Sequence, residues 1–267
     1  MDNVLTIKEQ LALEMSGKAI TFDDYKNEEN LMKFPFCSTS KRKRIDPIEY
    51  HSEDGYSLQV TANNTYGMAK IWDFDIVRYG LSKLSEISDA TGILLDHLTF
   101  SVYECLKTLN RNPKSGENIR WFREALDRLA STTYKTNIFG NESKKRVQGF
   151  TIIKYEYLET KNGTDKVKLT FDERLLNSIR KNDSLMKINP QLIRESAGIK
   201  KRLLELVAVN IVNEPSWEVA LEDLQKLCAN SWGKNRFKHE ISGYRDLPWK
   251  ISFLKKLSGV FVRFTNT

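Results

Sequence analysis

The chain has 267 residues, of which 40% are hydrophobic and 10% aromatic, a content that supports folded cores and excludes wholesale disorder. Its net charge of +7 favours a polyanionic partner without identifying one. No apolar run approaches the roughly 18–20 residues of a membrane span, so we expect a soluble protein of the cytoplasm that makes no membrane contact.

Cysteine and histidine usage argues against a metal site. Cys37, Cys105 and Cys228 lie far apart, with no CxxC motif and no His at ligand spacing, so we interpret them as reduced structural thiols. No GxxxxGK[ST] motif is present, which excludes a Walker-type ATP site. The three histidines lack the neighbours that a nucleophile needs. We therefore predict no cofactor, no metal and no catalytic residue, and so a protein that is not an enzyme.

The beginning of the chain differs from the rest in charge. Residues 1–31 carry a net charge of −4, which leaves +11 for the remainder. A weak helical pattern of leucine and isoleucine gives way to polar residues. We expect residues 1–30 to form a mobile arm or a short docking helix.

A basic run and a hairpin follow. IDPIEY and YSLQVTA predict two strands around Asp54-Gly55, a hairpin turn signal, and Pro47 makes the first strand an edge strand. The run before them is a phosphate clamp, a localisation-like patch or a solvated charge run. Beside a hairpin in a basic protein we favour the phosphate clamp. Its residues are Lys41, Arg42, Lys43 and Arg44.

Three helices come next. From Ile71 the hydrophobic period changes from two to 3.6, and IWDFDIVRYGLSKLSEI predicts a helix of about four turns. Asp73 and Asp75 fall in its first turn, where carboxylates suit the helix dipole. A second helix is predicted from Thr99 to Leu109. The third is SGENIRWFREALDRL, which Ser115 can cap.

This third helix has two interpretations. Arg120–Glu124 and Glu124–Arg128 are i,i+4 pairs worth only about 0.2–0.5 kcal/mol each, as on a solvated surface helix. Its place as the third helix of a unit that a basic loop follows is instead typical of a DNA recognition helix. We favour the second interpretation, in which Asn118, Arg120 and Arg123 approach the duplex.

Alternating strands return after this helix. TTYKTNIF is followed by a basic loop with Lys144, Lys145 and Arg146, and GFTIIKYEYLE pairs with KVKLTF across an Asn162-Gly163 turn. Three helices and a twisted hairpin are the order of a winged helix. We place the basic loop at the wing tip, where its cations contact phosphates or are simply solvated.

The second half repeats this plan without repeating the sequence. DERLLNSIRK and INPQLIRES are short helical pieces, IKKRLLELVAVNIV a buried helix, SWEVAL a strand and EDLQKLCAN a helix. A turn and helix follow, and WKISFLKK and GVFVRF form a hairpin around Ser258-Gly259. The predicted fold is α+β with two tandem winged-helix domains, residues 31–171 with the N-terminal hairpin and residues 172–267.

The helix GKNRFKHEISGYR is the stronger candidate for reading bases. Phe237 and Ile241 provide its inward anchor, and Glu240 is the one acid opposing the cations of its first two turns. Arg and Lys recognise guanine O6 and N7 in the major groove, and Asn recognises adenine. The alternative is a basic solvated turn. The candidate residues are Lys234, Asn235, Arg236, Lys238 and His239.

Three stretches, FPFCSTSKRKRIDPIEY, YGMAKIWDFDIVRY and REALDRLASTTYKTNI, resemble the plasmid replication initiator protein A family. The resemblance covers about residues 31–171 and continues through LMKINPQLIRES to DLPWKI. It implies an initiator that binds directly repeated sites (iterons) in double-stranded DNA at a plasmid origin, helps to open the origin and recruits host replication proteins. It also implies dimers that bind an inverted repeat near the protein's own promoter.

Two rival functions remain open. A transcriptional repressor could use the same modules without origin activity. A DNA nickase or nuclease would need a Tyr nucleophile with a His cluster, or an acidic cluster, and three scattered histidines disfavour it.

Overall fold

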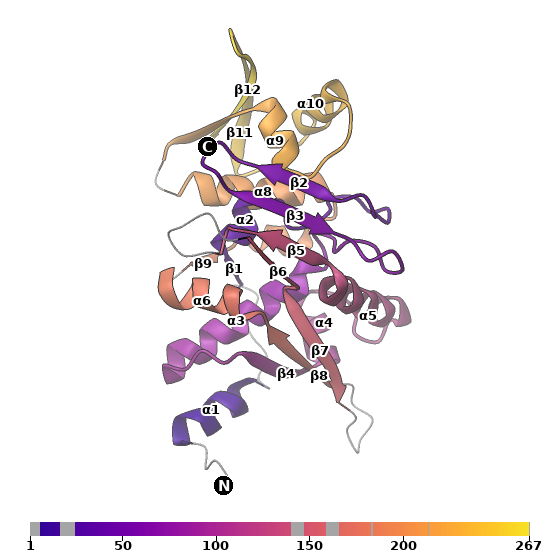
Figure 1. Cartoon of the computed structure of the whole chain (residues 1–267), viewed down its shortest axis with the longest axis vertical. Coiled ribbons are helices and arrows are strands. Elements are labelled where there is room, and N and C mark those ends of the chain that lie inside the picture. The colour runs from indigo at the N-terminus through magenta and orange to yellow at the C-terminus, as the bar shows by residue number, and fades with distance from the viewer. Residues whose placement is uncertain are drawn as a thin grey trace.

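Helices and strands alternate along the chain in the computed structural model, which describes residues 6–16, 25–139, 147–158, 166–182, 184–212 and 214–266 (Figure 1). The predicted cations Lys144, Lys145 and Arg146 lie outside the described residues, as does the predicted Asn162-Gly163 turn.

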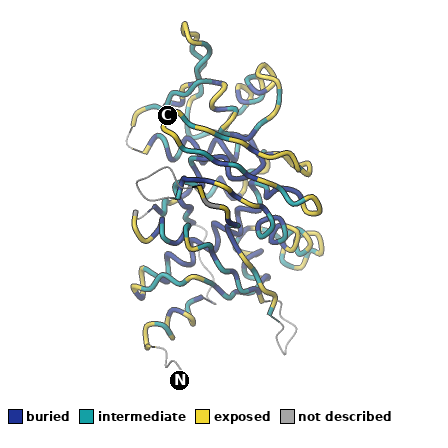
Figure 2. Tube along the Cα trace, in the orientation of Figure 1, coloured by how far each residue is buried: buried dark blue, intermediate teal, exposed yellow. Residues whose placement is uncertain are grey.

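The first half contains a unit of three helices and a three-stranded antiparallel sheet. Helix α3 (Phe74–Thr91) follows the predicted 3.6 period and is buried along most of its length (Figure 2). It ends at Gly92, whose φ of +74° is the left-handed conformation that glycine readily adopts there. The strand order is β4-β8-β7. The other elements are β4 (His97–Ser101), α4 (Val102–Thr108), α5 (Gly116–Ser131), β7 (Ile153–Leu158) and β8 (Lys166–Phe171).

Strand β4 corrects the prediction of a helix from Thr99. Residues 97–101 are extended and pair antiparallel with β8, and the helix starts only at Val102. Leu98 and Phe100 point into the core on alternate positions of the strand. Phe100 fits a helical stripe as well as a strand, so the pairing with β8 decides its conformation.

The second half contains a unit with the same element order. Helix α8 (Gly198–Asn210), predicted as buried, packs its apolar residues inward. The predicted hairpin turns at Gly259, whose φ is +130°. The strand order β10-β12-β11 again places the last strand in the middle. The other elements are β10 (Ser216–Ala220), α9 (Leu221–Leu227), α10 (Lys234–Ser242), β11 (Trp249–Lys256) and β12 (Gly259–Asn266).

A four-stranded antiparallel sheet of order β2-β3-β5-β6 combines the hairpin that precedes α3 with two strands that follow α5. Strand β2 lies at its edge, as Pro47 predicts, and Gly55 turns the hairpin with a φ of +83°. The basic loop falls between β5 and β6 in the sequence, outside the described residues, and its place at a wing tip stays a prediction. The four strands are β2 (Ile48–His51), β3 (Ser57–Thr61), β5 (Thr133–Thr136) and β6 (Gln148–Phe150).

The N-terminal elements pack against the body of the molecule. Helix α1 (Ile7–Ser16) contacts α3 and β4, with Ala12 fully buried. Strand β1 pairs antiparallel with β9 across the two halves of the sequence. These and the remaining short elements are β1 (Lys26–Glu28), α2 (Glu29–Lys33), α6 (Glu173–Asn182), β9 (Leu185–Lys187) and α7 (Gln191–Arg194).

The core of the first unit extends beyond residue 172. Apolar side chains of α6 and α7 belong to it, and the second unit has a smaller core of its own that starts at Ile199. The domain division at residue 172 stays a prediction. The structure adds that residues 173–194 share the first core.

A cluster of buried charges joins α3 to α8. The Asp75 carboxylate accepts hydrogen bonds from Arg78 at 2.6 Å and from Lys201 at 2.8 Å. Glu205 pairs with Arg78 and, at 2.9 Å, with Arg202. All five side chains are at most 2% exposed. Asp75 therefore holds the two units together, a role that its position in the first helical turn did not predict.

Candidate nucleic-acid interface

Helix α5 carries one buried face and one charged face. Phe122, Leu126 and Leu129 are fully buried, as predicted, and fix its orientation. Arg120 and Arg123 project outward and are exposed. The Arg123 guanidinium lies 6.0 Å from the centroid of the Tyr157 ring on β7.

Asn118 and Arg128 both have contacts within the protein. The Asn118 amide donates to the Asn112 carbonyl at 3.0 Å, so this contact fixes the start of α5. Arg128, predicted on the exposed face, is buried and donates twice to Asp73, at 2.7 and 2.9 Å. The Asp73 carboxylate also accepts from the Lys70 backbone N–H at 2.8 Å. Asp73 thus anchors α5 to the start of α3.

Helix α10 presents its predicted cations to solvent. Phe237 and Ile241 are fully buried and form the predicted anchor. The Arg236 guanidinium lies 4.2 Å from the centroid of the Trp232 ring, a cation–π contact that orients it. Asn235 and His239 are also exposed.

Two lysines of α10 have local contacts. The Lys234 ammonium pairs with Glu222, and because both side chains are exposed the pair is weak. The Lys238 ammonium lies 5.1 Å from the centroid of the Phe253 ring on β11.

The basic run divides into two anchored and two free cations. The Arg44 guanidinium donates to the carbonyls of Ala229, Asp46 and Pro47 at 2.6, 3.0 and 3.2 Å. The Lys43 ammonium donates to the Thr65 carbonyl at 2.9 Å. These contacts fix both side chains to the protein, and their role as phosphate ligands stays a prediction.

Lys41 and Arg42 remain available as the predicted phosphate ligands. Both are exposed, and within the described part of the chain neither side chain has a hydrogen-bond or ion-pair partner. A cation of this kind can approach a phosphate without first breaking a contact.

A groove of about 710 Å³ lies between the basic run and the second unit. Lys41 and Arg42 line one side, and Arg236 and Trp232 line the other. The first turn of α8 contributes Gly198 to its lining. The groove brings together two cationic groups that are almost two hundred residues apart in the sequence.

Gly198 permits this arrangement. A Cβ at this position would lie 2.1 Å from the Thr39 carbonyl oxygen, so only glycine lets the chain before the basic run rest on α8. The Thr39 hydroxyl donates to the Cys228 carbonyl at 2.9 Å. Thr39, just before the basic run, thus fixes the start of the run to the second unit.

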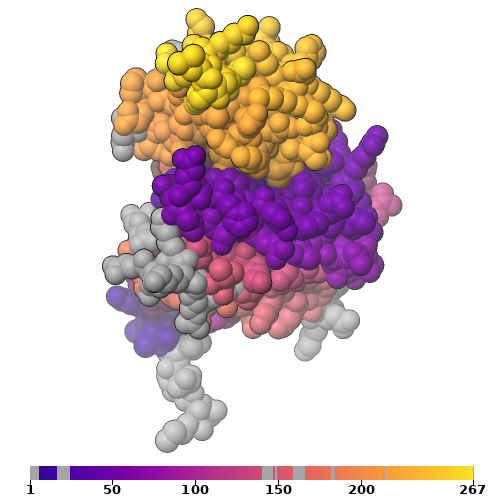
Figure 3. Space-filling view, turned by 45° about the horizontal axis from the view of Figure 1, so that its top comes forward, coloured from indigo at the N-terminus to yellow at the C-terminus, as the bar shows by residue number. Residues whose placement is uncertain are grey.

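Lys70, just before α3, supports the basic run. The Lys70 ammonium donates to the Lys41 carbonyl at 2.8 Å. The positive charge of Arg128 on α5 helps to lower the pKa of Lys70, after the larger effect of burial. In Figure 1, α10, the chain segments before β2 and after β3, and α5 lie on the same side of the molecule. Figure 3 shows the purple part of the chain as a band between the second unit and the pink part of the first.

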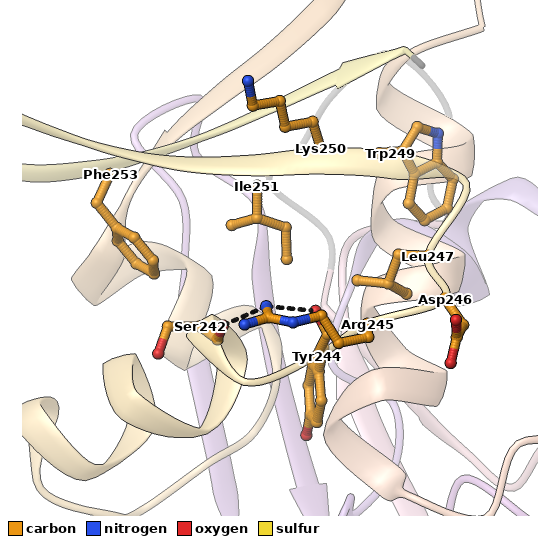
Figure 4. Close-up of a pocket in the computed structure, with 9 residues that line it drawn as sticks. All are labelled: Ser242, Tyr244, Arg245, Asp246, Leu247, Trp249, Lys250, Ile251 and Phe253. Atoms are coloured by element: carbon orange, nitrogen blue, oxygen red, sulfur yellow. Dashed lines mark hydrogen bonds between the residues drawn. The ribbon is translucent and has the colours of Figure 1, made fainter.

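A second hollow, of about 440 Å³, lies between the end of α10 and β11 (Figure 4). The Arg245 guanidinium donates to the Ser242 carbonyl at 3.1 Å and the Tyr244 carbonyl at 3.4 Å. Asp246 is the one carboxylate among its lining residues. This hollow separates the helix from the hairpin and contains no acid–base pair.

Sequence reasoning missed three contributors to this surface. Lys70 supports the basic run through the Lys41 carbonyl, and Trp232 orients Arg236. Lys255 is exposed near the tip of the β11–β12 hairpin. Strand alternation puts it on the face of β11 that carries Ile251 and Phe253, beside α10, and this period of two could have identified it.

Other classes of site have no support in the described residues. In those ranges no three His, Cys, Asp or Glu side chains are grouped as metal ligands would be. The three cysteines are buried free thiols. No helix of the described segments is long and apolar enough to traverse a bilayer.

Comparison with known proteins identifies the family. The family described as Replication initiator protein A matches residues 26–246, from β1 through α10. The chain belongs to this replication initiator family. The resemblance is confirmed, and the match includes its continuation as far as residue 246.

Individual relatives agree with this membership. A protein of Wigglesworthia glossinidia brevipalpis, named "Putative replication protein", is 28% identical over 228 residues, which are 83% of this chain and 81% of that protein. Two crystal structures of domains 2 and 3 of RctB share the fold, with TM-scores of 0.60 and 0.52 at 11% and 10% identity. They cover 89% and 90% of this chain, and 98% and 96% of their own chains are matched.

Proposed function

We propose that both units of this replication initiator are winged-helix modules that bind double-stranded repeats, iterons, at a plasmid origin. Each unit has the order helix, strand, helix, helix, strand, strand, with the last strand in the middle of the sheet. In such modules the third helix enters the major groove. The third helices here are α5 and α10, and each presents cations opposite its buried face.

The observation that carries this proposal is that the two third helices lie on the same side of the molecule. Helices α5 and α10 lie on one side of the molecule, with the basic run between them (Figure 1). Successive major grooves face the same side of a duplex once per helical turn, about 34 Å. One chain can therefore read two successive major-groove segments of one repeat.

The proposal extends to the rest of initiation. Phosphate contacts supply most of the salt-dependent affinity and base contacts the discrimination between sequences. Tandem binding in the cytoplasm then helps to open the origin and recruits host replication proteins, and dimers repress the protein's own promoter. The function requires binding and distortion of DNA, so we assign no enzymatic reaction to the chain.

The DNA around the gene tests this function against a repressor. A marker DNA that cannot replicate alone is joined to the gene and its flanking DNA and introduced into a host. We expect stable maintenance, which is lost when direct repeats spaced by whole helical turns are deleted. A flanking region that contains a lone palindrome and gives no maintenance would favour the repressor.

A further inference from the structure

The groove between the basic run and α10 has two walls that come from different parts of the chain. Its α10 wall carries Arg236, which belongs to the helix that the proposed function places in a major groove. Its opposite wall carries Lys41 and Arg42, which lie outside either unit's third helix. Helices α5 and α10 lie on one side of the molecule (Figure 1).

The free cations of this wall stand on a rigid base. Arg44 is held by three carbonyls and Lys43 by one, and the Met68 N–H donates to the Arg44 carbonyl at 2.9 Å. Lys41 and Arg42 are therefore positioned by the backbone while their side chains remain available. Anchored neighbours also lower the entropy that these two residues lose on binding.

The geometry of B-DNA assigns a place to such an element. On the side of a duplex that faces a protein, a minor groove lies between two successive major grooves, and a phosphate backbone runs along each boundary. An element between two major-groove helices consequently faces that minor groove. Arginine and lysine are attracted there, because a narrow minor groove concentrates negative potential.

We propose that the groove receives the phosphate backbone beside the major groove that α10 occupies, and that Lys41 and Arg42 reach into the adjoining minor groove. This inference rests on the proposed function and adds a third contact to it. Arg236, stacked on Trp232 on the opposite wall, remains free to reach the bases of that major groove. The basic run thereby sets the distance between the two major-groove segments that the protein accepts.

The test compares two double variants of the full chain. Lys41→Ala/Arg42→Ala removes the free cations. Lys8→Ala/Lys187→Ala removes the same charge from exposed positions on α1 and β9, on the other side of the molecule (Figure 1). Each protein is titrated with the duplex that the wild type selects from a random library, over a range of salt, and the complexes are footprinted with hydroxyl radicals. Hydroxyl radicals cut DNA at sugar hydrogens that line the minor groove.

The wild type should protect sugars in the minor groove between the two major-groove segments. Lys41→Ala/Arg42→Ala should lose this central protection and make the slope of log K against log salt shallower by about 1–2, while its preferred bases stay the same. The control should keep both properties, and all three proteins should melt at the same temperature.

Two outcomes separate the inference from the function on which it rests. Unchanged central protection and an unchanged salt slope in Lys41→Ala/Arg42→Ala would overturn the minor-groove contact and leave the proposed function standing. A wild type that selects no duplex sequence would overturn the proposed function and this inference together.

Discussion

Replacing Glu205 by glutamine should destabilise the protein far more than replacing Lys201 by methionine. The buried cluster that joins α3 to α8 has three cations and two carboxylates, a net charge of +1. Glu205→Gln raises this to +2 and leaves Arg78 and Arg202 facing a neutral amide. Removal of one partner of a buried ion pair costs about 3–5 kcal/mol, so we expect a loss in this range.

Lys201→Met has the opposite effect on the charge of the cluster, which becomes neutral. Asp75 keeps its hydrogen bond to Arg78 at 2.6 Å. Burial lowers the pKa of the Lys201 ammonium, because removing this charge from water costs free energy. Methionine at this position avoids that cost. Because Asp75 retains its pair with Arg78 and no buried charge is left unpaired, we expect Lys201→Met to cost less than Glu205→Gln, about 0–2 kcal/mol.

Urea unfolding followed by circular dichroism measures both free energies of unfolding by linear extrapolation. The wild type should unfold with a single transition, because the cluster couples the two units. If Lys201→Met destabilised the protein as much as Glu205→Gln, the net charge of the cluster would not determine the cost of these substitutions.

Three further predictions address the surface and the packing. Arg236→Ala should weaken binding to the selected duplex by about 1–3 kcal/mol and relax the preference at one base pair, and an intact sequence preference would contradict its assignment to base reading. Gly198→Ala should lower the free energy of unfolding by about 1–3 kcal/mol, because its Cβ meets the Thr39 carbonyl, whereas Gly116→Ala, with no atom within 4 Å, should lower nothing. Burial raises the pKa of Glu28 above its usual 4.5, because it favours the protonated carboxyl in the folded protein. Protonation of Glu28 therefore contributes fully to the free energy of unfolding below pH 4.5, and this contribution is lost as the pH rises through the raised pKa. Glu28→Gln should therefore reduce the difference in stability between mildly acidic and neutral buffer, and an unchanged difference in urea titrations would count against this.

Local signals predicted the elements that depend on local periodicity. The stripe of Phe122, Leu126 and Leu129 defined α5 to within about two residues, and glycines marked the hairpin turns at Gly55 and Gly259. Strand β4 was missed, because its five residues precede a helix without a break and only pairing with β8 makes them extended.

Partners distant in the sequence decided the remaining assignments. Arg128 had a surface pattern, yet Asp73, fifty-five residues away, draws it into the interior. Arg44 looked like a free cation within a basic run, but three carbonyls hold it. The groove needs Lys41 and Arg236 from opposite ends of the chain, and no local pattern reveals that they face each other.

The central claim is that the two units read adjacent segments of one duplex. Its most direct measurement is the selection of bound duplexes from a random library, repeated at low and moderate salt. We predict enrichment of one motif that spans about two helical turns, with informative base pairs in two major-groove segments that face one side. Salt-sensitive binding without any enriched sequence would contradict the claim, because the basic surface would then hold DNA without reading it.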